Sequence, residues 1–278
     1  MYLEHYKLAE NPFRLSPDPR FLHMGKSHKA ALRALWVGIA QRKGLLVLTG
    51  PVGAGKTLLL NTLLTVLSSR SATALFPTAL IVNPRLSSAE LLESLLDEFS
   101  LTCTSTSKAQ RWHHLQQLFF ATQNQGRTPL IFVDEAHLLS SDVAEELRLL
   151  MNVDTHRGKI LQVILSGQNE LIDRLRSKEL QALRQRIAVA VKLDLMNATE
   201  TAAYVRHRLR IAGCTNTSLF DDAALQRIHE LSDGAPRLIN TLCDTFLSIG
   251  FEMGTASIGV EIVNESASRH ELALMANS

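Results

Sequence analysis

The chain has 278 residues, of which 46% are hydrophobic and 20% are charged, and 29 Lys+Arg against 27 Asp+Glu give a formal net charge of +2. This composition excludes global disorder and allows one large domain, or a core with a smaller second domain. So small a net charge does not by itself indicate a nucleic-acid-binding protein. The 3 cysteines, Cys103, Cys214 and Cys243, are odd in number and lack metal-binding spacing, which predicts reduced thiols in a cytoplasmic protein.

The N-terminus carries no recognisable targeting signal. Its first residues, MYLEHYKLAENPF, lack the charged and then apolar plan of a signal peptide. No apolar run in the chain approaches the roughly 18–20 residues that a membrane helix needs. We therefore expect a soluble cytoplasmic protein without a transmembrane segment.

Four or five short apolar runs alternate with helical patterns, which is typical of a parallel sheet with crossover helices. Their continuous apolar character suits strands that are buried on both faces. The expected strands are Leu45–Thr49, Ala79–Asn83, Leu130–Asp134, Ile160–Ser166 and, less clearly, Ala188–Leu193. The helices expected between them are Leu58–Leu67, Ser87–Phe99 (with Ser88 as its N-cap), Lys108–Gln123 and Asp142–Met151.

After about Leu195 the strand pattern ends and only helical patterns follow. The expected helices are Thr199–Ile211, Asp221–Leu231, Pro236–Phe251 and Ile258–His270, separated by turns at Gly213, Gly234 and Gly254. This shift predicts an α/β core over residues 1–195 and a small helical domain over residues 196–270. Residues 271–278 are expected to form a frayed tail.

The most specific motif follows the first expected strand and precedes a helix. It fits G-x-x-x-x-G-K-[ST] with Gly50, Pro51, Val52, Gly53, Ala54, Gly55, Lys56 and Thr57, and Leu58 continues the helix. Glycines let backbone N–H groups curve around phosphates, and the helix N-terminus adds positive potential. Lys56 is expected to reach the β- and γ-phosphates and the Thr57 hydroxyl to ligate Mg²⁺, so the motif predicts ATP and Mg²⁺ as cofactors.

Two carboxylates end a second expected strand. Asp134 at the strand end can hold the hydration shell of Mg²⁺, and the adjacent Glu135 can orient and deprotonate an attacking water. On the next strand, Gln168, or less favourably Ser166, is placed to hydrogen-bond the γ-phosphate or that water. A simple polar turn explains Gln168 equally well.

Five cations follow within 13 residues: Arg174, Arg176, Lys178, Arg184 and Arg186. A run of charges is usually a solvated helix face. An arginine at a subunit edge can instead reach a neighbour's γ-phosphate, and for this role Arg186 comes first and Arg184 second. In the helical domain, Gly-Ala-Pro-Arg opens a helix and places Arg237 early in it, which favours a nucleotide-sensing role over a solvent-facing one.

Taken together, these motifs resemble the AAA+ ATPases. The N-terminal segments Met1–Tyr6, Asn11–Phe13, Pro17–Leu22 and Ser27–Leu32 are similar to those of the ExeA/GspA-type secretion ATPases. The stretch Gly167–Leu171 resembles that family's GQPEL, with Asn169 in place of the proline. The resemblance extends over residues 1–270 and implies an AAA+ P-loop core, with helices on both faces of a parallel sheet, plus a C-terminal helical lid.

The resemblance also implies roles for particular residues. The segment Phe21–His28, within an N-terminal part spanning residues 1–30, would border the adenine. Lys56, Thr57, Asp134 and Glu135 would carry binding and hydrolysis, and Arg237 would be the lid sensor. The family assists assembly of secretion secretins and related pili. Larger members add a transmembrane segment and a periplasmic peptidoglycan-binding domain, and neither is recognised in this sequence. The sequence is therefore closer to the short pilus-biogenesis-type members, or to similar ATPases that accompany transposases and hold target DNA.

Three functions remain open at this point. The first is a homo-oligomeric AAA+ ATPase, a ring or filament, that drives assembly of a secretion or pilus machine and is held by a partner at the cytoplasmic face of the inner membrane. The second is an ATP-dependent, DNA-binding regulator of transposition that partners a transposase and polymerises on DNA. It is supported by the basic runs Arg206–Arg210 and Arg174–Arg186, although exposed helix faces are the favoured explanation of both. The third is a metabolic P-loop kinase, against which the Asp134–Glu135 pair and the all-helical C-terminal part argue.

Overall fold

The computed structural model describes residues 2–16, 18–69, 76–152, 154–155 and 158–265. Internal contacts divide the chain into two compact units, each described by itself. The helical unit comprises Met1–Lys26, Val52–Gly55 and Asp194–Ser278, and the sheet unit comprises Ser27–Pro51 and Lys56–Leu193. The division after Leu193 lies close to the boundary expected at residue 195. The expected tail, 271–278, lies outside the described residues.

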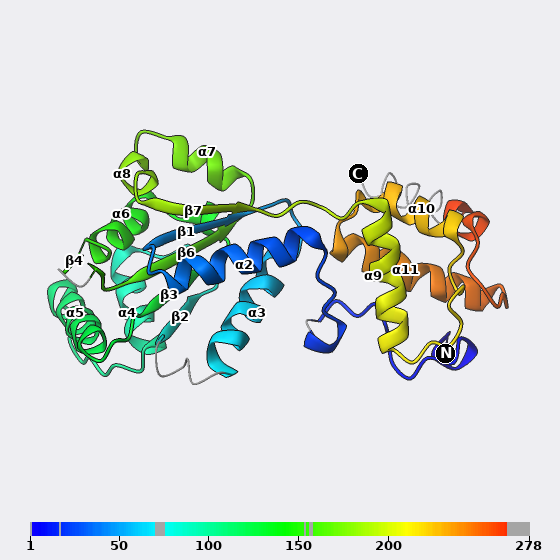
Figure 1. Ribbon diagram of the computed structural model, residues 1–278, viewed down its shortest axis with the longest axis horizontal. Coiled ribbons are helices and arrows are strands. Elements are labelled where there is room, and N and C mark those ends of the chain that lie inside the picture. The colour runs from blue at the N-terminus through cyan, green and yellow to red at the C-terminus, as the bar shows by residue number, and fades with distance from the viewer. Residues whose placement is uncertain (1, 17, 70–75, 153, 156–157, 266–278) are drawn as a thin grey trace. The chain divides into compact units, whose positions relative to one another are not determined.

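Five parallel strands form the sheet of the sheet unit (Figure 1). Their order across the sheet is β2 (Thr78–Ile81), β3 (Leu130–Val133), β6 (Gln162–Gly167), β1 (Leu45–Thr49) and β7 (Ile187–Lys192). β1 therefore lies between β6 and β7, with Leu45 opposite Val163 and Ile187. All five expected strands are confirmed, with small shifts at their ends. The carboxyl ends of β1, β3 and β6, which precede the candidate site residues, lie at one edge of the sheet.

Apolar side chains cover both faces of this sheet. On one face, alternate strand residues such as Leu45 and Val47 belong to a buried cluster with leucines of the helices that follow β2, β3 and β6. These helices are α4 (Ser88–Glu98), α5 (Lys108–Asn124), α6 (Ser141–Leu150), α7 (Glu170–Arg176) and α8 (Gln181–Arg184). On the other face α2 (Lys26–Ala40) approaches so closely that a Cβ on Gly38 would lie 2.6 Å from Leu46. α2 crosses in front of the strands in Figure 1.

The N-cap of α4 differs from the expectation by one residue. Ser87, rather than the expected Ser88, is the N-cap of α4: its hydroxyl accepts from the backbone N–H of Glu90, whose carboxylate accepts from the Ser87 N–H. This reciprocal capping box satisfies two backbone donors that the helix leaves unpaired. Ser88 is the first helical residue. In the same unit, α3 (Lys56–Ser69) begins at the end of the phosphate-binding motif, and two short strands, β4 (Asp154–Thr155) and β5 (Gly158–Lys159), form an antiparallel pair.

Three long helices build the helical unit. They are α9 (Ala198–Ile211), α10 (Asp222–Ser232) and α11 (Pro236–Glu252), preceded in the chain by α1 (Tyr2–His5) and a 3-10 turn, Pro19–Phe21. Gly213, Gly234 and Gly254 have positive φ in the turns that end the helices, as expected. The last expected helix is helical over residues 260–265, and Ile258 pairs instead with Phe220 in an isolated bridge.

The N-terminal segment differs from expectation. The sequence assigns residues 1–30 to the core, but Phe13 and Phe21 are buried among the helices of the helical unit. Arg208 of α9, which is buried, donates to the carbonyl oxygens of Pro12 (2.5 Å) and Arg14 (3.2 Å) and lies over the Phe21 ring. The segment before α2 is therefore a strap on the helical unit, because these long-range contacts outweigh its closeness in sequence to the sheet.

The sequence predicts no transmembrane segment and reduced cysteines. Among the described residues, no helix has both the length and the apolar character needed to cross a membrane. The three cysteines are all described and all free: Cys243 is buried, and Cys103 and Cys214 are half-buried. Burial raises the pKa of the Cys243 thiol well above its ordinary value.

Candidate functional site

The loop between β1 and α3 has the backbone that the phosphate-binding motif predicts. Gly53 and Gly55 have φ values of 75° and 89°, a region that glycine enters without strain. At Gly50 the requirement is space, because a Cβ there would lie 2.9 Å from the carbonyl oxygen of Leu193. Pro51 and Val52 continue the loop, and Ala54 is buried. Thr57 and Leu58 lie in the first turn of α3.

The Lys56 side chain is folded back onto the start of its own loop. Its ammonium donates to the carbonyl oxygens of Gly50 (2.9 Å) and Pro51 (2.8 Å) and is nearly buried. Burial lowers the pKa of Lys56, while the negative charges of Glu135, Asp134 and Glu170 oppose that shift. The ammonium is thus held in a site where negative charge is favourable, and phosphate oxygens can take the place of the two carbonyls.

Asp134, directly after β3, is hydrogen-bonded to the first turn of α3 and to the end of β6. Its Oδ2 accepts from the Thr57 hydroxyl at 2.6 Å, and its Oδ1 accepts from the Ser166 hydroxyl at 2.9 Å and from the Glu135 backbone N–H at 3.0 Å. Asp134 is 4% exposed and Ser166 fully buried. The structure therefore brings together the two residues expected to ligate metal, Thr57 and Asp134, and adds Ser166 to them.

The oxygens of this cluster suit a hard cation such as Mg²⁺. Magnesium is held by one or two protein oxygens together with water and phosphate, not by a full protein cage. Among the described residues, no three His, Cys, Asp or Glu side chains are grouped as a metal site. The hydroxyl of Thr57 and the carboxylate of Asp134 fit the ion in number and in chemistry.

Glu135 stands apart from Asp134 in both backbone and exposure. Its backbone is left-handed (φ 48°, ψ 34°), which turns the chain sharply into the 3-10 turn Ala136–Leu138. Its carboxylate is 40% exposed and lies 3.3 Å from Nδ1 of His137. The two neighbouring carboxylates are thus separated: one is buried in hydroxyl contacts, and the other faces solvent beside an imidazole.

His137 connects this turn to the strand that carries the expected sensor. The backbone N–H of Gln168 approaches the His137 Nδ1 at 3.5 Å, and the Arg174 guanidinium donates to the His137 carbonyl oxygen at 2.6 Å. Nδ1 cannot serve both neighbours at once, because the Gln168 N–H needs a bare nitrogen and the Glu135 carboxylate needs a protonated one. In the sequence His137 follows two residues after Glu135, but no local signal identifies its link to Gln168.

Of the two expected sensor residues, Gln168 contacts the site through its backbone, whereas Ser166 contacts Asp134 through its side chain. The Gln168 side chain is half-buried at the end of β6. Its sensor role therefore stays a prediction, and the less favoured Ser166 gains a direct contact.

The arginines of the basic run separate into two groups. Arg174 and Arg176 are engaged, the first with His137 and the second with Asp173 at 3.4 Å. Arg184 ends α8 and is exposed, and Arg186 directly precedes β7 and is half-buried. Arg237, the second residue of α11, is also exposed. Among the described residues, the guanidinium groups of Arg184, Arg186 and Arg237 form no hydrogen bond or ion pair, so they are available to a ligand or partner; their backbones do form hydrogen bonds.

The chain is similar to known proteins in sequence. The AAA domain family matches residues 39–175. The chain is 39% identical over 259 residues to the general secretion pathway protein A of Aeromonas hydrophila, covering 93% of this chain and 46% of that protein. The chain thus spans about half the length of this relative.

Solved structures show the same fold at low sequence identity. The ORC2 protein of Aeropyrum pernix, solved as ADPNP-ADP complexes, is similar with a TM-score of 0.68 and 16% identity, over 95% of this chain and 74% of that one. The RuvB Holliday junction branch migration motor of Thermotoga maritima is similar with a TM-score of 0.57 and 20% identity, over 88% of this chain and 69% of that one. With its phosphate-binding loop, its parallel sheet and its C-terminal helices, the chain belongs to the AAA+ ATPases, and over most of its length it is similar to the general secretion pathway protein A.

Proposed function

We propose that this AAA+ ATPase binds and hydrolyses ATP with Mg²⁺ to drive or time the assembly of a secretion or pilus-type machine. The observation that carries the chemistry is the hydrogen-bonded chain Thr57–Asp134–Ser166 beside the buried Lys56 ammonium, at the ends of β1, β3 and β6. In this arrangement a cation, two hydroxyls and a carboxylate converge on the loop that can cradle phosphates.

Each residue of the site has a specific task in this proposal. The backbone N–H groups of Gly50–Thr57 receive the phosphates, and the Lys56 ammonium exchanges its two carbonyl partners for phosphate oxygens. Thr57 and Asp134 would hold Mg²⁺, which neutralises charge on the β- and γ-phosphates when bound. Ser166 keeps Asp134 oriented. Glu135, which is free of the hydroxyl chain, accepts a proton from the attacking water.

Catalysis in this proposal also needs the unpaired arginines. Arg186 reaches the γ-phosphate of a neighbouring subunit, with Arg184 as the alternative, and Arg237 senses the nucleotide from α11. Gln168 positions the water or the γ-phosphate from the end of β6. Arginine suits these tasks because its planar group donates two hydrogen bonds to one phosphate. A homo-oligomer, as a ring or a filament, follows from an arginine that acts in trans.

The cellular role rests on the relative that is a secretion protein. Its identity of 39% over most of this chain favours secretion or pilus assembly over the regulation of transposition. Lid movement that follows the nucleotide state would pass the signal to the assembled machine. The protein would act in the cytoplasm, at the membrane through a partner.

The decisive variant is Glu135→Gln, which keeps the shape of the side chain and removes its basicity. Turnover of ATP is expected to fall by at least about 100-fold, while labelled ATP stays bound and the oligomer becomes more stable. Lys56→Ala is the matched control, in which binding itself is lost. Phosphate release by Glu135→Gln at the wild-type rate would reject Glu135 as the base.

An experiment in cells tests the assembly role separately from ATP hydrolysis. Glu135→Gln expressed beside the wild-type chain is expected to trap mixed oligomers and to lower secretion or piliation, without changing the transposition frequency. The reverse pattern would reject the assembly role and leave the ATPase chemistry intact.

A further inference from the structure

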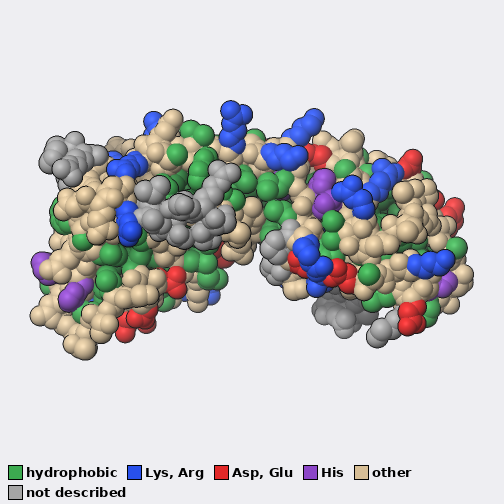
Figure 2. All heavy atoms as spheres, turned by 60° about the horizontal axis from the view of Figure 1, so that its bottom comes forward, with side chains coloured by type: hydrophobic (Ala, Val, Ile, Leu, Met, Phe, Trp, Pro, Cys, Tyr) green, Lys and Arg blue, Asp and Glu red, His purple; other side chains and the backbone are tan. Residues whose placement is uncertain are grey.

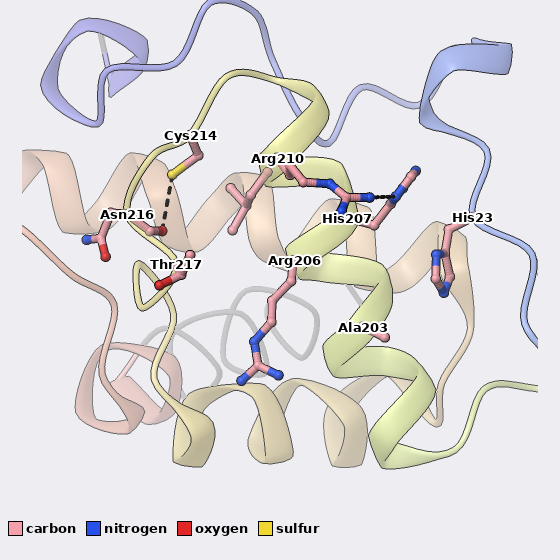
Figure 3. A pocket seen from close by; sticks show the side chains of 9 residues that line it. His23, Ala203, Arg206, His207, Arg210, Cys214, Asn216 and Thr217 are labelled. Atoms are coloured by element: carbon pink, nitrogen blue, oxygen red, sulfur yellow. Dashed lines mark hydrogen bonds between the residues drawn. The ribbon is translucent and has the colours of Figure 1, made fainter.

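A basic hollow on α9 takes no part in the proposed ATPase chemistry. Arg206, His207 and Arg210 line it, spaced so that they share one face of the helix, and its volume is about 320 Å³. His23, Ala203, Leu209 and the turn residues Cys214, Asn216 and Thr217 complete the lining. All these residues belong to the helical unit. Figure 3 shows the Arg210 guanidinium extended toward His207, with Arg206 pointing along the opposite side of the helix.

The lining is positive because it contains cations and no carboxylate. Figure 2 shows histidine side chains beside those of Lys and Arg on the surface of the C-terminal helices. Arg206 has a carboxylate partner outside the hollow, Asp222, at 2.5 Å, but the two side chains are 49% and 92% exposed. Such a surface pair contributes little to stability, and a ligand can replace its carboxylate at low cost.

Arg210 differs from the other arginines of its helix in its partner. Arg208 is buried and donates to backbone carbonyls. Arg210 lies in the last helical turn, where a cation could simply stabilise the helix dipole, but its Nη2 bonds to His207 Nδ1 at 3.1 Å. A guanidinium held by a neutral ring retains its full charge, since no anion offsets it.

The hydrogen bond from Arg210 also determines the state of His207. A ring nitrogen that accepts from a guanidinium carries no proton, so the proton of the neutral ring lies on Nε2. Nε2 is buried and has no partner among the described residues. Burial, followed by the charges of His23, Arg210 and Arg208, lowers the pKa of His207. A positive environment of this kind favours an anion over a further cation.

We propose that Arg206, His207 and Arg210 form a binding site for a phosphate group on α9. Arg206 and Arg210 lie one helical turn apart and are both exposed, so when Arg206 leaves Asp222 the two guanidinium groups can turn toward the acceptor oxygens of one phosphate. Asn216 and Thr217 can donate further hydrogen bonds from the turn. The phosphate could be free or belong to the backbone of duplex DNA. Both present the same oxygens and charge to the site.

The test follows the His207 ring by NMR in a Lys56→Ala background, so that the phosphate-binding loop does not compete. Titration with inorganic phosphate is expected to shift the His207 signals saturably and to raise the pKa of the ring, because a bound anion stabilises its protonated form. Arg210→Gln is expected to weaken this binding by at least about tenfold. Arg227→Gln is the matched control, an exposed arginine of α10 that pairs with Glu230.

A second arm identifies the source of the phosphate. Duplex DNA replaces inorganic phosphate, and affinity is measured across a salt series for the parent protein, Arg210→Gln and Arg227→Gln. A salt slope that falls by about 1 in Arg210→Gln only would assign the site to backbone phosphates. Saturable inorganic phosphate with no DNA binding would assign it to a free anion.

Two results would overturn the proposal. One is the absence of a saturable His207 shift with both ligands, and the other is an equal loss of binding in Arg210→Gln and Arg227→Gln, which would indicate general surface charge. The measurement does not depend on ATP hydrolysis, so either result would leave the proposed ATPase function standing.

Discussion

Each unit buries a charged side chain to nearly the same depth, Asp134 at 4% exposure in the sheet unit and Arg208 at 6% in the helical unit. Asp134 is bonded by two hydroxyls and one backbone N–H, and hydroxyls can turn toward other partners. Arg208 is bonded to two backbone carbonyls and to the Tyr204 hydroxyl, and it lies over the Phe21 ring. A ligand can replace the first set of partners but not the second. Asp134 and Arg208 are therefore equally buried, but Asp134 belongs to a site that can bind a ligand, whereas Arg208 stabilises the fold.

The helical unit also depends on close approaches between backbone segments. A substitution at such a position is expected to cause the largest loss of stability. A Cβ on Gly234 would lie 1.9 Å from the Met196 carbonyl oxygen, at a φ of 72°. Gly234→Ala is expected to lower the free energy of unfolding by about 4 kcal/mol, from the clash and the left-handed backbone together. Gly254→Ala is the control: its φ is 67° but nothing lies within 4 Å, so about 1 kcal/mol is expected. Urea denaturation would measure both, and equal losses would exclude the clash as the cause.

Arg208→Met tests whether the buried guanidinium holds the N-terminal strap. It removes the donors to the carbonyl oxygens of Pro12 and Arg14, and about 3 kcal/mol of unfolding free energy is expected to be lost. Arg210→Met on the same helix is exposed and should cost less than about 0.5 kcal/mol. Limited proteolysis should then cut the strap in Arg208→Met alone. An Arg208→Met protein as stable as Arg210→Met would show that the strap is held by apolar contacts.

Asp134→Asn should give the smallest change in stability and a large change in function. The amide can accept from one hydroxyl and donate to the other, so the hydrogen bonds of Thr57 and Ser166 remain satisfied without a buried charge. The free energy of unfolding is expected to change by less than about 1 kcal/mol, while turnover with Mg²⁺ collapses. Paired denaturation and phosphate-release measurements would check this. A loss of several kcal/mol would mean that this carboxylate supports the fold, as Arg208 does.

The sequence predicts those features that depend on a pattern of neighbouring residues. The strands and the phosphate-binding loop were identified because their signals lie within a few adjacent residues, such as the apolar run before Gly50 and the Lys56–Thr57 pair. Chain topology then brings Thr57 to Asp134, which the sequence analysis anticipates only through the Mg²⁺ that both residues are expected to bind.

Contacts between distant residues were not predictable in the same way. Ser166 meets Asp134 across 32 residues, and Arg208 meets Pro12 across 196 residues. No periodicity connects such pairs. The sequence therefore predicts the N-terminal strap as part of the core, and it favours Gln168 over Ser166 as the residue that contacts the site. The helices α2, α7 and α8 were also not predicted. α7 and α8 are short and lie in a stretch where the charged residues dominate the pattern.

The left-handed backbone of Glu135 has a thermodynamic consequence. A non-glycine residue in this conformation costs about 1 kcal/mol or more, which glycine would relieve and asparagine would reduce. Either replacement should yield a protein that resists heat better but lacks the carboxylate that we propose as the base. The wild-type chain keeps this unfavourable backbone conformation at Glu135, and its melting temperature is correspondingly lower than the same fold could reach.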